Sequence, residues 1–443
     1  MTGTVEILII GGGEAAYCAA AAAARAGAAT ALVARKKSEC APSPSSCHVP
    51  NFVWRRLDLQ EYGLSLEPVS ALVTLLPNGE TVASSASARD TKAALAETGK
   101  HDHVVWTEFV EDMKKLGRDV HLSPAVGGSG AAKMNKLAYL YGGLDVLSAL
   151  GQVTGGCADL LDDYLADEGL KAHVAAHALS PAGVGASEAG GGASLPELFS
   201  EDAWRVRAGK DSPQLIKTLQ TICKDSGVDC REDDIADIAG ESGRMQTVTL
   251  AGGDKLKARY ILFASPEAAA VNGYYGDAAP LAARGRATAQ LRIKLKKPFA
   301  PPVADEKAVF QIIDDLADLQ AASDAVADGA LPDKPPVAFE FAENGDIIAR
   351  TSYCPKAFRE DDEWRGWTGQ DRQAVTKRIM DRLSDRIDGL SVNVRKTDFK
   401  LYGADAPEHD RFVNGGENIF ILPNRHNAIA EAVKLVDKVL SGE

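Results

Sequence analysis

The chain has 443 residues, of which 45% are hydrophobic and 25% charged, and a formal net charge of −13. This length exceeds that of one typical domain and predicts two. The acidic charge argues against nucleic acid and anionic membrane as partners of the surface as a whole. No hydrophobic run approaches the roughly 18 residues of a membrane span. The N-terminus lacks signal-peptide regions, and seven scattered cysteines suit a reducing cytoplasm.

The N-terminal stretch has the pattern of a nucleotide-binding unit. Val5–Ile10 predicts a buried strand, the alanine-rich Glu14–Arg25 a helix, and Thr30–Ala34 a second buried strand. The turn between the first two elements fits the G-x-G-x-x-G/A fingerprint of dinucleotide-binding folds. Its residues are Gly11, Gly12, Gly13, Glu14, Ala15 and Ala16. Backbone N–H groups at the start of such a helix can hold a diphosphate.

One part of the fingerprint is missing at the end of the second strand. The acidic residue that would bond the adenosine ribose is replaced by Ala34, and Arg35, Lys36 and Lys37 follow it. This basic cluster suits a 2′-phosphate, or it is a solvated strand end. The motif alone therefore leaves the cofactor open.

The next segment, from Lys36 to Phe52, is predicted to be a loop because it carries three prolines and a serine cluster. It contains Cys40 and Cys47 in a C-x6-C spacing. These are either a redox-active pair beside the cofactor or two small loop residues. Nothing nearby in the sequence favours a thiolate at either position.

The middle of the chain predicts a hairpin and several helices. Ala71–Leu76 and Thr81–Ala83 flank the turn signal Pro77-Asn78-Gly79. Ala88–Leu116 is predicted to be helical, and its His101-x-His103 is taken as a polar loop rather than as metal ligands. The segment His173–Leu195 has no clear period and is predicted to be a loop near a substrate passage or a surface insert.

The second half predicts strands, helices and a hairpin over Asn344-Gly345. Tyr260–Ser265 is a hydrophobic run that ends before Pro266, as expected of a strand whose end approaches the cofactor. The other predicted strands are Gln246–Leu250, Thr288–Leu295, Val337–Ala342, Asp346–Ser352, Val392–Leu401 and Asn418–Leu422, and the predicted helices are Gln370–Ile387 and Ala428–Leu440.

Taken in order, these segments resemble the flavin-containing amine oxidase and phytoene desaturase superfamily. The resemblance rests on IIGGGEAAYCAAAAAARAG, WRVRAGKDSPQLIKTLQTICKDSGVDC, VTLAGGDKLKARYILFASP and GGENIFILPNRHNAIAEAVKLVDKVL. It implies an α/β fold with a Rossmann-like FAD-binding domain, whose parallel sheet is discontinuous in sequence, and an inserted α+β substrate domain. The FAD-binding domain would comprise residues 1–65, 205–287 and 405–443, and the substrate domain residues 66–204 and 288–404.

The resemblance also implies which further residues approach FAD. They are Gly209, Ser265, Asn424, Arg425 and Asn427, with His426 as a candidate acid or base. Two more departures accompany Ala34. A double glycine expected after the second strand is missing, and Pro423-Asn424 replaces a terminal Gly-Asp.

Three hypotheses follow. The first is an FAD-dependent oxidoreductase that oxidises or desaturates a small or carrier-bound organic substrate by hydride transfer to flavin. The second is a flavin-linked dithiol oxidoreductase that uses Cys40 and Cys47. The third is a degenerate member of the fold that only binds or assembles. The sequence predicts no metal site, and it leaves the electron acceptor and a homodimer open.

Overall fold

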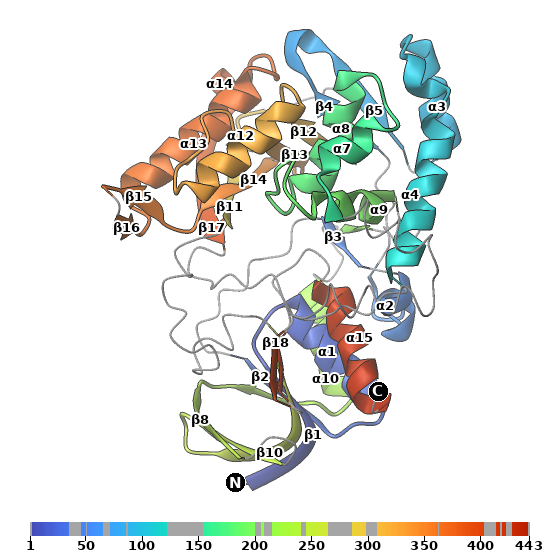
Figure 1. The fold of residues 1–443 in the computed structure, drawn as a ribbon. Helices are drawn as coiled ribbons and strands as arrows, with labels where there is room; N and C mark the ends of the chain where they lie inside the picture. The colour runs from blue at the N-terminus through green and yellow to red at the C-terminus, as the bar shows by residue number, and fades with distance from the viewer. Residues whose placement is uncertain are drawn as a thin grey trace.

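A computed structural model describes the chain in segments that form two large sheets (Figure 1). The described residues are 2–34, 46–49, 51–64, 71–85, 87–121, 154–199, 205–207, 215–240, 245–264, 286–297, 308–342, 344–361, 363–402, 413–416, 419–421 and 428–441. The first sheet lies beside α1, α10 and α15 in the lower part of the view, and the second lies among the helices above.

The first sheet is mainly parallel and is built from three distant parts of the chain. Its strand order is β18-β19-β10-β1-β2-β7, with β9 and β8 joined at the side through β10. The strands are β1 Thr2–Ile10, β2 Thr30–Ala34, β7 Asp229–Glu232, β8 Ile235–Ala239, β9 Gln246–Leu250, β10 Lys255–Phe263, β18 Val413–Gly416 and β19 Ile419–Ile421. β1 pairs in parallel with β10 and β2, β2 with β7, and β10 with β19. The predicted discontinuous α/β sheet is confirmed.

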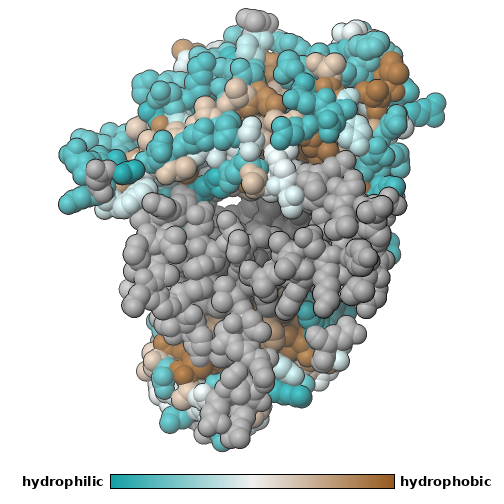
Figure 2. All heavy atoms as spheres, in the orientation of Figure 1, coloured by the Kyte–Doolittle hydropathy of each residue, from teal (hydrophilic) through white to brown (hydrophobic). Residues whose placement is uncertain are grey.

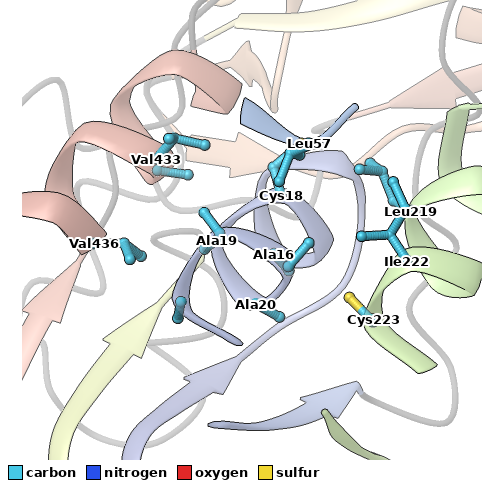
Figure 3. Packing of buried hydrophobic residues seen from close by; sticks show 14 of the residues in the cluster. Ala16, Cys18, Ala19, Ala20, Leu57, Leu219, Ile222, Cys223, Val433 and Val436 are labelled. Carbon is cyan, nitrogen blue, oxygen red and sulfur yellow. The ribbon is translucent and has the colours of Figure 1, made fainter. Parts of the chain in front are cut away.

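Three helices cover one face of this sheet, and α1 lies between the other two (Figure 3). They are α1 Glu14–Arg25, α10 Leu215–Asp225 and α15 Ala428–Ser441. Ala19 and Ala20 of α1 are fully buried, as are Ile222 of α10 and Val433 of α15. Because alanine adds only a methyl group, both neighbouring helices can approach α1 closely. The alanine run of the sequence is therefore the core of this layer.

The second sheet is mainly antiparallel, with strand order β17-β11-β14-β13-β12-β4-β5. Its strands are β4 Leu72–Leu75, β5 Thr81–Ser84, β11 Arg286–Leu295, β12 Val309–Ile312, β13 Val337–Phe341, β14 Ile347–Pro355 and β17 Val394–Tyr402. Both predicted hairpins are confirmed: β4 pairs with β5 across the short 3₁₀ turn Pro77–Gly79, and β13 pairs with β14. The only parallel pair described in this sheet is β12 with β4.

Most of the remaining elements are helices around the second sheet. They are α3 Ala88–Glu97, α4 Trp106–His121, α7 Cys157–Asp162, α8 Glu168–Leu179, α9 Ser194–Phe199, α12 Leu316–Ala327, α13 Gly369–Ser384 and α14 Leu390–Asn393. The helix α2 Asn51–Arg56 instead contacts α15 of the first layer. Two small strand pairs complete the fold: β3 Ser46–His48 with β6 Arg205–Arg207, and β15 Phe358–Glu360 with β16 Glu363–Arg365. The helix predicted over Ala88–Leu116 is divided, because Gly99 takes a φ of 74° that ends α3.

The loop predicted over His173–Leu195 is wrong for its first part, because His173–Leu179 belongs to α8. Leu170, Ala172, Val174, Ala175, Ala176 and Leu179 of this helix are all buried, and so are Lys171, His173 and His177. A helix that is buried nearly all round has no polar face, so its sequence shows no amphipathic period.

Hydrophilic side chains cover most of the coloured surface in the upper part of the view in Figure 2, with hydrophobic ones scattered among them. Large hydrophobic side chains that are exposed in the described ranges include Val104, Met245 and Val392. Within those ranges, no helix combines the length and hydrophobicity needed to cross a bilayer.

Candidate cofactor site

The carboxyl ends of the parallel strands meet at one edge of the first sheet. Ile10 at the end of β1 is in register with Phe263 of β10, which is in register with Ile421 of β19. On the other side, Ile10 is in register with Val33 of β2. The glycine turn leaves β1 at this edge, and the Gly11 N–H donates to the Val33 carbonyl at 3.0 Å. In open parallel sheets this edge is where ligands bind.

The turn adopts a conformation that glycine alone takes readily. Gly11 has a φ of 133°. Gly13, the N-cap of α1, has a φ of 87° and a ψ of −177°, in a region that other residues essentially do not occupy. No side chain caps the first turn of α1. The backbone N–H groups in the first turn of α1 therefore lie at the carboxyl edge of the sheet. This arrangement fits an anion such as a diphosphate.

Two residues of the fingerprint after Gly13, Glu14 and Ala16, differ in what they contribute. Ala16 is fully buried under the helices, as the third position of the fingerprint requires. Glu14 places a carboxylate in the first turn, where the helix dipole favours negative charge. Burial raises the pKa of the Cys18 thiol, and the charge of Glu14 raises it further. Glu14 and Cys18 are four residues apart and lie on one side of α1.

Most other predicted site residues lie outside the described residues. They are Arg35, Cys40, Gly209, Ser265, Asn424, Arg425, His426 and Asn427. Three described residues precede some of them in the chain: Ala34 ends β2, Ala264 follows β10, and Ile421 ends β19. The described strand ends around them meet at the edge that carries the glycine turn. Their roles stay predictions.

The backbone of Cys47 lies in β3, where it is in register with Val206 of β6. Its partner Cys40 is outside the described segments. The prediction of a redox pair at Cys40 and Cys47 is therefore untested.

An acidic residue that the sequence reasoning missed lies at the same edge. Glu232, the last residue of β7, is in register with Ala34, where the expected acid is absent. Residues in register on neighbouring strands point to the same face, so Glu232 is on the face of Leu32, which packs with the helices. Glu232 is exposed. The acidic run Glu232-Asp233-Asp234 was the available signal, but only the strand order connects it with Ala34.

The His101–His103 segment forms a 3₁₀ turn between α3 and α4. The Asp102 carboxylate is buried and accepts hydrogen bonds from the backbone N–H groups of Ala166 and Asp167, at 3.0 and 2.7 Å. These hydrogen bonds give the buried Asp102 carboxylate a structural role. The described residues contain no group of three or more His, Cys, Asp or Glu side chains able to hold a metal ion.

Comparison with known proteins identifies the fold. No protein-family model matches the chain, and no curated protein matches it by sequence. Among solved structures, it is similar to wild-type putrescine oxidase bound to putrescine, with a TM-score of 0.54, 11% identity and 100% coverage of both chains. It is also similar to cyclohexylamine oxidase from Brevibacterium oxydans IH-35A, with a TM-score of 0.53, 12% identity and 99% coverage of both.

A third similar structure is a Rab GDI from Plasmodium falciparum, with a TM-score of 0.52, 9% identity, and coverage of 100% of this chain and 99% of that one. At such identities the likeness shows the fold, and it confirms the fold that the family resemblance predicted. Two of these names give a reaction and one does not, so the fold alone leaves the activity undecided.

Proposed function

We propose that the chain is an FAD-dependent oxidoreductase that oxidises a small organic substrate. The observation that carries the proposal is the turn at Gly11–Gly13. Its backbone takes a glycine-only conformation at the carboxyl edge of a parallel sheet and leaves the first turn of α1 without a side-chain cap. Turns that only glycine can form occur where a ligand needs close access to the backbone.

The chain's own residues would bind and orient the cofactor. Backbone N–H groups at the start of α1 would hold the diphosphate, and Arg425 would add a positive charge from the segment between β19 and α15. Glu232 is the acid best placed by strand register to take the ribose role that Ala34 cannot fill. Bound FAD would supply the hydride acceptor. The second sheet and its helices would hold the substrate, following the domain boundaries predicted from the sequence.

The names of the fold neighbours indicate which type of bond the chain would oxidise. Putrescine oxidase and cyclohexylamine oxidase are named for amines, which favours oxidation of a C–N bond in an amine over desaturation of a C–C bond. A cavity with hydrophobic walls and few polar groups would orient such a substrate and exclude water.

A second candidate function is binding without catalysis. The Rab GDI among the neighbours favours it, and so do Ala34 and Pro423-Asn424, which replace residues that the family uses for the cofactor. The two candidates differ in one property that can be measured: a catalytic member must retain flavin.

The visible absorbance spectrum of the purified chain tests the proposal. We expect the bands of oxidised flavin, or their recovery after incubation with FAD and gel filtration. Anaerobic addition of putrescine or cyclohexylamine should bleach these flavin bands if an amine is the substrate. Hydrocarbons with the same carbon skeletons are the control and should leave the bands unchanged. A protein that stays colourless after incubation with FAD contradicts the proposal and favours the binding function.

Arg425→Ala tests the predicted role of the segment before α15. Loss of a charge-assisted contact to a phosphate typically costs about 1.5–3 kcal/mol, so the dissociation constant for FAD should rise roughly tenfold to a hundredfold. The rise should be larger at low salt, because salt screens the charge. Arg395→Ala, which removes an exposed arginine on β17, is the matched control. Equal constants for Arg425→Ala and the parent would exclude this role.

A further inference from the structure

Two cysteines outside the predicted redox pair lie on either side of the turn that joins α10 to β7. Cys223 is in the last turn of α10, and Cys230 is the second residue of β7. A tight turn joins the two elements: Gly227 has a φ of 78°, and the Val228 N–H donates to the Cys223 carbonyl at 2.9 Å. The chain thus turns back within a few residues, so the end of α10 lies beside the start of β7.

The strand register shows which way Cys230 points. Cys230 is in register with Leu32 of β2. Leu32 and Cys223 belong to one hydrophobic cluster on the helix-covered face of the sheet. Because side chains in register share a face, Cys230 lies under α10 on the side of Cys223. Cys223 is buried and Cys230 is exposed, so one sulfur of the pair is accessible from solvent and the other is not.

The two thiols interact and differ in character. Each thiol affects the ionisation of the other: the neighbouring sulfur raises the pKa of Cys223 and lowers that of Cys230. Burial raises the pKa of Cys223 further, while burial and the charge of Asp229 partly oppose the shift at Cys230. The exposed sulfur is therefore the better nucleophile, and the buried thiol beside it keeps its proton.

Cys223 also contacts α1 directly. Its thiol donates to the Tyr17 carbonyl at 3.5 Å, and Gln220 Nε2 of the same helix donates to the Tyr17 hydroxyl at 3.1 Å. The Tyr17 N–H in turn donates to the Gly13 carbonyl at 3.1 Å. Figure 3 shows Cys223 on α10 at the side of α1 that carries Ala16 and Ala20. Cys223 therefore contacts Tyr17, and Tyr17 is hydrogen-bonded to Gly13 of the glycine turn.

We propose that Cys223 and Cys230 form a thiol pair that a peroxide converts into a disulfide. The Cys230 thiolate attacks hydrogen peroxide; an S–O bond forms, the O–O bond breaks, and hydroxide leaves. The Cys223 sulfur then attacks the sulfenic sulfur, and an S–S bond forms. The hydroxyl group of the sulfenic acid leaves as water with the Cys223 proton. Two electrons pass from the two sulfurs to the peroxide. The bridge does not depend on the proposed flavin chemistry.

The test treats the purified full chain with hydrogen peroxide, blocks remaining thiols with a maleimide, and maps cross-links by non-reducing mass spectrometry. We expect a Cys223–Cys230 cross-linked peptide that dithiothreitol removes and that Cys230→Ser lacks. Cys223→Ser should instead leave a sulfenic acid at Cys230 that dimedone traps. Cys354→Ser, which changes a buried thiol of β14 in the other sheet, should keep the cross-link at the parent's yield.

A measurement on the unchanged chain guards against misfolded variants. Iodoacetamide should alkylate Cys230 at least about tenfold faster than Cys18 or Cys354, because both of these thiols are buried and their pKa values are raised. Peroxide-treated protein that shows no Cys223–Cys230 peptide, or only a Cys40–Cys47 peptide, overturns the proposal. Alkylation of Cys230 as slow as that of the buried thiols does the same.

Discussion

Gly13→Val should weaken FAD binding by at least about a hundredfold, which corresponds to about 2.7 kcal/mol. Gly13 has a φ of 87° and a ψ of −177°, and a Cβ there would both strain the backbone and stand between the turn and a diphosphate. The measurement is the dissociation constant of FAD, obtained by titrating apoprotein and following flavin fluorescence.

Gly27→Val is the matched control, because Gly27 lies just beyond the other end of the same helix with a φ of 90°, and a Cβ added there would meet no neighbouring atom within 4 Å. Both variants add a side chain at a positive φ, so both should lose stability by roughly 1–3 kcal/mol. Only Gly13→Val should lose cofactor. If valine prevents folding, alanine at the same two positions keeps the comparison. Equal FAD affinity at both positions would remove the glycine turn from the cofactor site.

His173→Ala should destabilise the fold by roughly 2–5 kcal/mol. His173 is 1% exposed, and its Nδ1 and Nε2 each lie 2.8 Å from a hydroxyl oxygen, of Thr74 on β4 and Ser84 on β5 respectively. A neutral imidazole donates from one nitrogen and accepts at the other, so a single ring joins α8 to both strands of the hairpin. Alanine would leave a cavity and two buried hydroxyls without this partner. Urea unfolding measures the loss.

The same histidine predicts an acid-sensitive stability. Burial, and secondarily the charge of Lys100, lowers the pKa of His173 from 6.5 to about 3. Between these values the unfolded chain binds a proton that the native chain does not, so stability falls as the pH falls through this window. Within this window, His173 changes the free energy of unfolding by about 1.4 kcal/mol for each pH unit. Above the pKa of the unfolded state, the full stabilisation by neutral His173 is present.

His173→Gln removes the titrating group, so it should reduce the dependence of unfolding free energy on pH between about pH 6 and about pH 4. His101→Gln, at an exposed position, is the control and should keep the dependence of the parent. An unchanged pH dependence in His173→Gln would show that other groups cause the acid sensitivity.

Local signals in the sequence predicted those parts of the fold that local chemistry decides. The helix Glu14–Arg25 and the strand Thr30–Ala34 have the predicted bounds, because glycine turns enclose an alanine run and a short apolar run. The hairpin over Pro77–Gly79 follows from its turn residues.

Features that depend on tertiary contacts escaped the same reasoning. The helix at His173 has no period because neighbours bury it on all sides. Glu232 lies beside Ala34 only through the pairing of β2 with β7, which connects residues about 200 positions apart. For the candidate site, the fingerprint located the turn, but no local pattern shows which distant side chains join it at the sheet edge.

The interleaved order of the first sheet has a consequence for how the chain is made. Thr2 of β1 pairs with Lys255 of β10, and Phe263 of β10 pairs with Ile421 near the end of the chain. At roughly 5–20 residues per second, β1 is synthesised about 10–50 s before its β10 neighbour. During this interval the hydrophobic strand has an open edge that can pair with other chains. Completion of the sheet must wait for β18 and β19, so a chaperone that shields the nascent N-terminus should raise the yield of folded protein.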